Sequence, residues 1–203
     1  MAINQEPQVF LFLSELLGRK IVDSEGRPLG KILDLTGNIG EIYPPVTEIL
    51  LRSATDGKIV LFPWRRLAEV NGKLVAHPLQ PDDFRAPALR TGELFLKETL
   101  LDKQVVDTDG AKIRRVNDLQ FLKSQKTLYL VHVDVGFHGL LRRVGLERPV
   151  NFLFRVLFDY TLTDQLISWK FVQPVSSPDL LRLTVAQNRL AQLHPADLAD
   201  IIE

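Results

Sequence analysis

The sequence is notable for what it lacks: it has no cysteine, one methionine and no net charge, with 25 basic and 25 acidic residues. The absence of cysteine excludes disulfides, thiolate catalysis and cysteine-ligated zinc. No stretch of about 18 residues is both apolar and uncharged, so no segment is expected to span a bilayer. The N-terminus has neither a basic region nor a small-residue cleavage site, so we expect no signal peptide. A pore and a secreted disulfide scaffold are therefore excluded.

The composition is that of an ordinary globular protein, with 45% hydrophobic and 25% charged residues in 203. This length suits one large domain or two small ones, since domains typically have about 100–150 residues. Zero net charge argues against a globally basic nucleic-acid binder, although it leaves room for a local basic patch.

A repeat with an offset of 84 residues organises the chain. Residues 17–35 read LGRKIVDSEGRPLGKILDL, and residues 101–119 read LDKQVVDTDGAKIRRVNDL, without a gap. A tryptophan follows an apolar run later in each copy, at Trp64 and Trp169, where we expect core or rim packing. Identical residues at equivalent positions are Leu17/Leu101, Val22/Val106, Asp23/Asp107, Gly26/Gly110, Asp34/Asp118 and Leu35/Leu119.

Each copy reads as a β-rich unit. The sequences DSEG and DTDG predict turns in which aspartate caps and glycine supplies a positive φ. Asp34 and Asp118, which recur at one repeat position, are expected to hydrogen-bond a turn. Alternation predicts that Leu128, Leu130, His132 and Asp134 share one strand face. The expected strands are 8–13, 20–23, 29–36, 46–53, 58–63, 93–96, 103–107, 112–122, 126–135 and 165–172.

The units differ in what joins their fourth and fifth strands. The first uses the short turn 54–58, whereas the second inserts about 30 residues, 136–164, with a helical pattern. The proline-rich stretch 77–87 reads as a linker. After a second linker at 174–178, a helix is predicted to start at Pro195 and to run uncapped to Glu203. We therefore expect this chain to be the front part of a longer protein.

The segment SELLGRKIVDSEGRPLGKILDL, with its apolar strand pair and late FPW, resembles a PRC-barrel domain. That family includes a photosynthetic reaction-centre subunit and the ribosome maturation factor RimM, and the two matches cover about residues 8–175. The tail LAQLHPADLADIIE resembles the start of the intracellular N-terminal domain of MgtE-type magnesium transporters. The resemblance implies a mainly β fold of two small PRC-like β-barrels in tandem, with a helical insertion in the second and a short C-terminal helical tail. The implied boundaries are 1–80, 88–175 with the insertion near 136–164, and 180–203.

No enzyme is expected, because the sequence has no glycine-rich phosphate loop, zinc-protease motif or nucleophile elbow. His132 and Asp134 could form a polar pair on one strand, although a solvated barrel face is the favoured interpretation. Asp107 and Asp109 suggest a calcium loop, but Ala111 stands where another oxygen ligand is needed, which favours a structural turn. We therefore expect no catalytic residue and no cofactor in this segment.

Three acidic residues on the last predicted helix form one stripe, which could supply part of a Mg²⁺ site completed by downstream domains. A solvated helix face is the competing interpretation, and it is favoured. The residues are Asp197, Asp200 and Glu203.

A basic segment at 111–156 has nine basic and three acidic residues, a local charge of +6, whereas residues 1–62 have a charge of −2. Its helices could cap a barrel, dock a partner or second copy, or lie on an anionic membrane surface. Nucleic acid is not expected, because the aromatic residues suit packing better than base stacking. The candidate residues for a partner or membrane surface are Arg142, Arg143, Arg148, Phe152 and Arg155.

These features together predict a non-enzymatic intracellular regulatory module, the N-terminal part of an MgtE-like protein, acting through protein–protein contacts. Its partner would be a separate protein, downstream domains of the same chain or a second copy. Cytoplasmic localisation is expected, with membrane association through other regions or a partner, and Mg²⁺ would act through the full-length protein. A RimM-like RNA or ribosome-assembly factor and a peripheral membrane adaptor are the alternatives.

Overall fold

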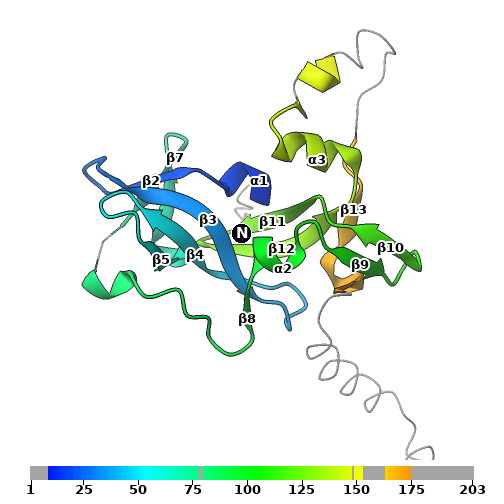
Figure 1. Cartoon of the computed structure of the whole chain (residues 1–203), viewed down its shortest axis with the longest axis horizontal. Coiled ribbons are helices and arrows are strands. Elements are labelled where there is room, and N and C mark those ends of the chain that lie inside the picture. The colour runs from blue at the N-terminus through cyan, green and yellow to red at the C-terminus, as the bar shows by residue number, and fades with distance from the viewer. Residues whose placement is uncertain (1–8, 78–79, 148, 153–162, 175–203) are drawn as a thin grey trace, which may run out of the picture.

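The computed structural model describes residues 9–77, 80–147, 149–152 and 163–174, and it is mainly β (Figure 1). The mainly β prediction is thus confirmed. The predicted tail at 180–203 lies outside these residues, together with the candidate metal ligands Asp197, Asp200 and Glu203.

The largest sheet is built mainly from the first repeat and curls into a half-barrel. Its strands follow the order β5-β4-β3-β2-β7-β6, with β8 pairing β3. All pairings are antiparallel except β2 with β7. The strands are β2 (Lys20–Val22), β3 (Pro28–Asn38), β4 (Val46–Ser53), β5 (Ile59–Pro63), β6 (Leu67–Val70), β7 (Lys73–Ala76) and β8 (Glu93–Phe95).

The second repeat, with strand β1 from the first, forms two smaller antiparallel sheets. One has four strands in the order β1-β11-β12-β13, and the other has three in the order β10-β9-β14. The first comprises β1 (Val9–Phe12), β11 (Asp118–Ser124), β12 (Thr127–Asp134) and β13 (Leu166–Ser168). The second comprises β9 (Gln104–Asp107), β10 (Lys112–Arg115) and β14 (Val172–Pro174).

Short helices connect the strands. Both buried tryptophans begin a 3-10 turn, at η1 (Trp64–Arg66) and η3 (Trp169–Phe171), which confirms that these repeat positions serve packing. Other helices with described bounds are α1 (Leu13–Leu16), η2 (Pro81–Asp83), α2 (Leu96–Leu100) and α3 (Phe137–Arg143).

The two repeats exchange their first strand and helix. Strand β1, which opens the first repeat, pairs with β11 of the second, and β8, which opens the second, pairs with β3 of the first. The attached helices follow their strands, so α1 packs on β11 and α2 packs on β3. Each repeat is therefore completed by an element of the other.

A single hydrophobic core joins the repeats as a consequence of this exchange. Leu16 in α1 and Leu100 in α2 occupy equivalent repeat positions, and both are fully buried in that core. Burying one leucine contributes about 1.5–3 kcal/mol, so each exchanged helix anchors the opposite unit.

Most predicted strands are present with shifted ends, but one hairpin was missed. Strands β6 and β7 are joined by Asn71-Gly72, both at positive φ (50° and 73°). An Asn-Gly pair between strands is a strong hairpin signal, because both positions of its turn need positive φ. The predicted strand at 112–122 is also split into β10 and β11.

A bulge corrects the predicted face of β12. The register shifts between Gln120 and Phe121 of β11, so that β12 has one extra residue, Val131, at this point. Leu128 and Leu130 therefore share the core with Val133, rather than a face with His132 and Asp134 as alternation predicted.

The two predicted turns also differ. Gly26 closes the first with φ of 81°, as expected, whereas in the second Ala111 has the positive φ (49°) and Gly110 does not. The Asp107 carboxylate accepts the backbone N–H groups of Asp109 and Gly110 at 3.1 and 3.0 Å. The structural-turn interpretation of this sequence is therefore the one that the contacts support.

Candidate functional site: an ionic network under the helical insertion

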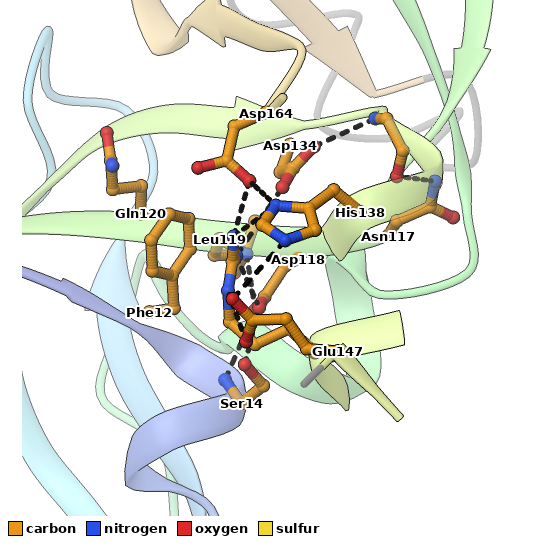
Figure 2. A network of polar contacts seen from close by, with 12 residues as sticks. Phe12, Ser14, Asn117, Asp118, Leu119, Gln120, Asp134, His138, Glu147 and Asp164 are labelled. Atoms are coloured by element: carbon orange, nitrogen blue, oxygen red, sulfur yellow. Dashed lines mark hydrogen bonds and ion pairs between the residues drawn. The ribbon is translucent and has the colours of Figure 1, made fainter. Parts of the chain in front are cut away.

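The inserted helix α3 lies across the ends of β11 and β12, and a network of polar side chains joins them (Figure 2). Gly145, at φ of 74°, ends the helix. Its N–H donates to the Arg142 carbonyl at 3.1 Å, and the Leu146 N–H donates to that of Leu141 at 2.9 Å. This Schellman arrangement fixes where the chain turns back after α3.

Arg142 is the centre of the network. Its side chain is only 9% exposed, and one guanidinium nitrogen lies 3.4 Å from Asp118 and 3.5 Å from Asp134, both fully buried carboxylates. The other terminal nitrogen pairs with Asp164. The guanidinium carbon lies 3.4 Å from the centre of the Phe12 ring, a cation–π contact with the exchanged strand β1.

Asp118 caps the exchanged helix α1. Its carboxylate accepts the Ser14 hydroxyl at 2.5 Å and the Ser14 N–H at 3.1 Å, as well as its neighbour Leu119 N–H at 2.9 Å. Ser14 stands in the first turn of α1, where backbone N–H groups lack partners within the helix. We expected this aspartate to hydrogen-bond a turn; the structure shows it bonded to Leu119 in its own strand and to a helix of the other repeat.

Asp134 contacts the first residues of the insertion and holds them against the sheet. It accepts the Gly136 N–H at 2.8 Å, and Gly139 of α3 packs directly against its carboxylate. A Cβ added at Gly139 would overlap that carboxylate. The glycine is therefore required by close approach of the helix backbone to the sheet.

His138 joins parts of the insertion to one another through both ring nitrogens. Nδ1 lies 2.7 Å from Asp164, and Nε2 lies 3.3 Å from Glu147 and 3.0 Å from the Asn151 amide nitrogen. The Asn151 Oδ1 atom is buried, and no group among the described residues hydrogen-bonds it. One buried imidazole of α3 thus joins three residues that follow this helix in the chain.

Burial governs the ionisation of the acidic residues. It raises the pKa of Asp118 and of Asp134, and the bonds from Ser14 and Gly136 and the charge of Arg142 oppose that rise. Burial by itself would lower the pKa of Arg142, but Asp164, Asp118 and Asp134 more than compensate, and the net direction is upward. Breaking a buried pair of this kind by removing one partner typically costs about 3–5 kcal/mol.

The first repeat has the same cap without the network. Asp34 accepts the N–H groups of Lys97 and Glu98 in α2 at 2.7 and 3.1 Å. The position equivalent to Asp134 is occupied by Leu50, which pairs with Asp34 across the sheet. The buried Glu48 of this repeat pairs instead with Arg85 from the connection between repeats.

His132 and Asp134, which were predicted to form a polar pair, have different partners in the structure. His132 Nδ1 hydrogen-bonds with the Gln120 side chain at 2.9 Å, while Asp134 belongs to the Arg142 network. Burial lowers the pKa of His132. His132 lines a cavity of about 430 Å³ together with Phe10, Tyr43, Leu122, Tyr129, Val131 and Ser168.

The residues predicted to form a partner or membrane surface also lie in different surroundings. Arg142 faces inward, Arg143 pairs at 3.0 Å with Asp102, and Phe152 is 63% exposed. Arg148 and Arg155 lie outside the residues whose side chains the structure describes. Within the described ranges, no group of three or more His, Cys, Asp or Glu side chains could hold a metal ion.

Sequence reasoning missed the network, although the repeat contained an indication of it. The equivalence of Leu50 and Asp134 places an acid at a core-adjacent position of the second copy alone, next to its insertion. An acid at such a position needs a cationic partner, and Arg142 and Arg143 are nearby in sequence.

Comparison of this chain with known proteins finds a similarity over part of its length. No family model matches it. One similar protein is the ferric-anguibactin-binding protein FatB of Vibrio anguillarum, 29% identical over 113 residues, or 52% of this chain. The chain covers 34% of that protein's length. Among the described residues, no helix is long and apolar enough to cross a membrane.

Proposed function

We propose that the chain is a non-enzymatic binding and regulatory module of the tandem PRC-barrel type, the N-terminal part of an MgtE-like magnesium-transport protein, acting through protein–protein contacts. One observation supports it above all: the buried ionic side chains are used to fix an inserted helix on a barrel. Arg142 is surrounded by Asp118, Asp134 and the Phe12 ring, so its charge is used to hold the helix on the sheet.

The network makes helix α3 a fixed part of the surface. Asp118 simultaneously holds α1, while Asp134 holds α3, so movement of one helix disturbs the other. A rigid platform of this kind suits recognition, since little ordering is required when a partner binds. Binding of a partner to the insertion would in turn stabilise the joint between the repeats.

Magnesium would act outside the described part of the protein in this proposal. Asp197, Asp200 and Glu203 supply carboxylates of the kind that Mg²⁺ prefers, and domains after Glu203 would complete the site. The resemblance to the MgtE N-terminal domain supports this placement.

The test is magnesium uptake into vesicles by the natural full-length protein, compared with a version lacking residues 1–174. We expect the deletion to change the Mg²⁺ concentration at which uptake is inhibited while leaving the maximal rate unchanged. An unchanged dependence on Mg²⁺, or a reading frame without regulatory and membrane-spanning domains, would overturn the proposal.

Ferric-siderophore binding is a second candidate, supported by the partial similarity to FatB and by the aromatic cavity. Trp169 follows directly after Ser168, which lines that cavity. Titration with a ferric siderophore should then quench Trp169 fluorescence, and Tyr129→Ala should abolish the quenching. Absence of saturable quenching would reject this candidate.

A further inference from the structure

The insertion has a second face that its anchoring does not use. His138, Leu141 and Arg142 of α3 are turned toward the barrel, whereas Phe137 and Val144, two helical turns apart, are 57% and 55% exposed. Leu146 and Phe152, in the chain that follows, are 50% and 63% exposed. We call these four apolar residues the outer face of the insertion. A gathering of large exposed apolar side chains in one short segment marks an interaction surface.

Basic side chains border this face. Arg143 of α3 and Arg115 of β10 both pair at 3.0 Å with Asp102, so α3 and β10 lie on the same side of the protein (Figure 1). All four residues of β10, Lys112–Arg115, are exposed, and three of them are basic. The apolar face therefore adjoins a positively charged surface.

The fold increases the positive charge that this region shows to solvent. Of the three acidic residues in segment 111–156, Asp118 and Asp134 are fully buried and Glu147 pairs with His138. Arg142 is the basic residue that is buried with them. Among the side chains that the structure describes in this segment, burial therefore removes two negative charges and one positive charge from the surface.

We infer that the outer face of the insertion docks on an anionic bilayer surface. Exposed phenylalanine and aliphatic side chains beside arginine and lysine suit the headgroup region, where apolar groups enter the acyl boundary and basic groups meet lipid phosphates. An acidic protein would use the basic groups but would leave the four exposed apolar side chains without a matching environment. The inference deepens the proposed function, because it places the module against a membrane.

The experiment is co-sedimentation of the full 203-residue chain with phosphatidylcholine vesicles, with and without phosphatidylglycerol. We expect binding only to the anionic vesicles, with affinity falling as salt is raised, since each exposed basic residue contributes about 1 kcal/mol, or roughly fivefold. The Val144→Ser/Phe152→Ser double variant should bind about tenfold or more weakly. The matched control is Ile42→Ser/Val70→Ser, which removes exposed apolar side chains from the first repeat.

Several outcomes would overturn the inference. They are absence of binding at low salt, equal loss in the control variant, or equal binding to neutral vesicles. A dimer in solution that Val144→Ser/Phe152→Ser dissociates would assign the face to a second copy instead. The uptake experiment on the full-length protein can fail while vesicle binding persists. Vesicle binding can likewise fail while the uptake result holds, so the two proposals can be tested separately.

Discussion

Both repeats hold an exchanged helix with a buried aspartate, but they differ in the residues around that aspartate. In each, a buried aspartate, Asp34 within β3 or Asp118 at the start of β11, caps a helix donated by the other repeat. Only the second adds a further acid, Asp134, where the first has Leu50. The difference teaches that the cap belongs to the shared fold, whereas the ionic network belongs to the insertion.

The divergence extends to a turn that both repeats need. Gly18 and Asp102 occupy equivalent positions, and both have positive φ, at 76° and 64°. Glycine adopts this conformation without strain, and aspartate tolerates it better than most residues. In the second repeat Asp102 pairs with Arg115 and Arg143. The residue at this turn therefore also helps to hold helix α3 in place.

The largest expected effect comes from removing the central cation. Arg142→Met should lower the free energy of unfolding by about 3–5 kcal/mol, because Asp118 and Asp134 lose their shared buried partner. Adding Asp134→Leu, which restores the residue type of the first repeat, should recover a large part of that loss. Urea denaturation measures both. Equal stability of the single and double variants would show that the network is not the source of the difference.

The strand exchange can be tested with a matched pair in the helices. Leu16→Ala and Leu100→Ala each remove a fully buried side chain, at an expected cost of about 2–5 kcal/mol. Because α1 packs on β11, Leu16→Ala should accelerate hydrogen exchange in β11 more than in β3, and Leu100→Ala should do the opposite. Faster exchange within the mutated repeat instead would contradict the exchanged arrangement.

The caps should differ in strength. Asp118→Ala leaves the Ser14 hydroxyl and N–H without their acceptor and deprives Arg142 of a partner, whereas Asp34→Ala affects only backbone donors. Each buried donor left unpaired costs about 1–3 kcal/mol, so Asp118→Ala should destabilise more than Asp34→Ala. Thermal denaturation of the two variants side by side gives the comparison, and the reverse order would refute it.

Much of the fold followed from the repeat, because turns and apolar alternation recur at fixed positions. The exchange could not be predicted, since identical sequence positions allow a strand to pair within its own repeat or across to the other. The face of β12 was mispredicted because one inserted residue, Val131, reverses alternation without changing the apolar pattern. The network depends on Arg142 reaching Asp118 from 24 residues away, which spacing alone does not reveal.

The pH dependence of stability should also distinguish the repeats. Burial raises the pKa of Asp134 above its ordinary value of 3.8, so the folded state holds its proton more tightly than the unfolded state does. Stability contributed by this group is therefore present at low pH and is lost as the pH rises from 3.8 through the raised pKa. Asp134→Asn should reduce that decline in urea titrations at successive pH values.

The surface residue Asp56 is the control for this titration. Its hydrogen bonds with Ser53 and Lys58 lower its pKa to about 2, so its contribution is lost as the pH falls from 3.8 toward 2. Asp56→Asn should therefore alter only the acid limb of the profile. Suppose instead that Asp134→Asn changes the stability below pH 3.8 and leaves the decline in stability above pH 3.8 unaffected. The burial of Asp134 is then not what shapes the pH profile.

The smallest effect on stability is expected from a substitution at the turn that contains Asp102. Asp102→Gly restores the residue of the first repeat and relieves a positive φ, but it removes the ion pairs with Arg115 and Arg143. Partly exposed pairs are worth about 1 kcal/mol or less, and glycine gains little at a turn that aspartate already tolerates. The two changes should nearly cancel, leaving the denaturation midpoint almost unchanged. Hydrogen exchange in α3 should nevertheless increase, because Arg143 then no longer ties this helix to β10. A stable α3 in Asp102→Gly would mean that the buried network alone is sufficient to hold the insertion.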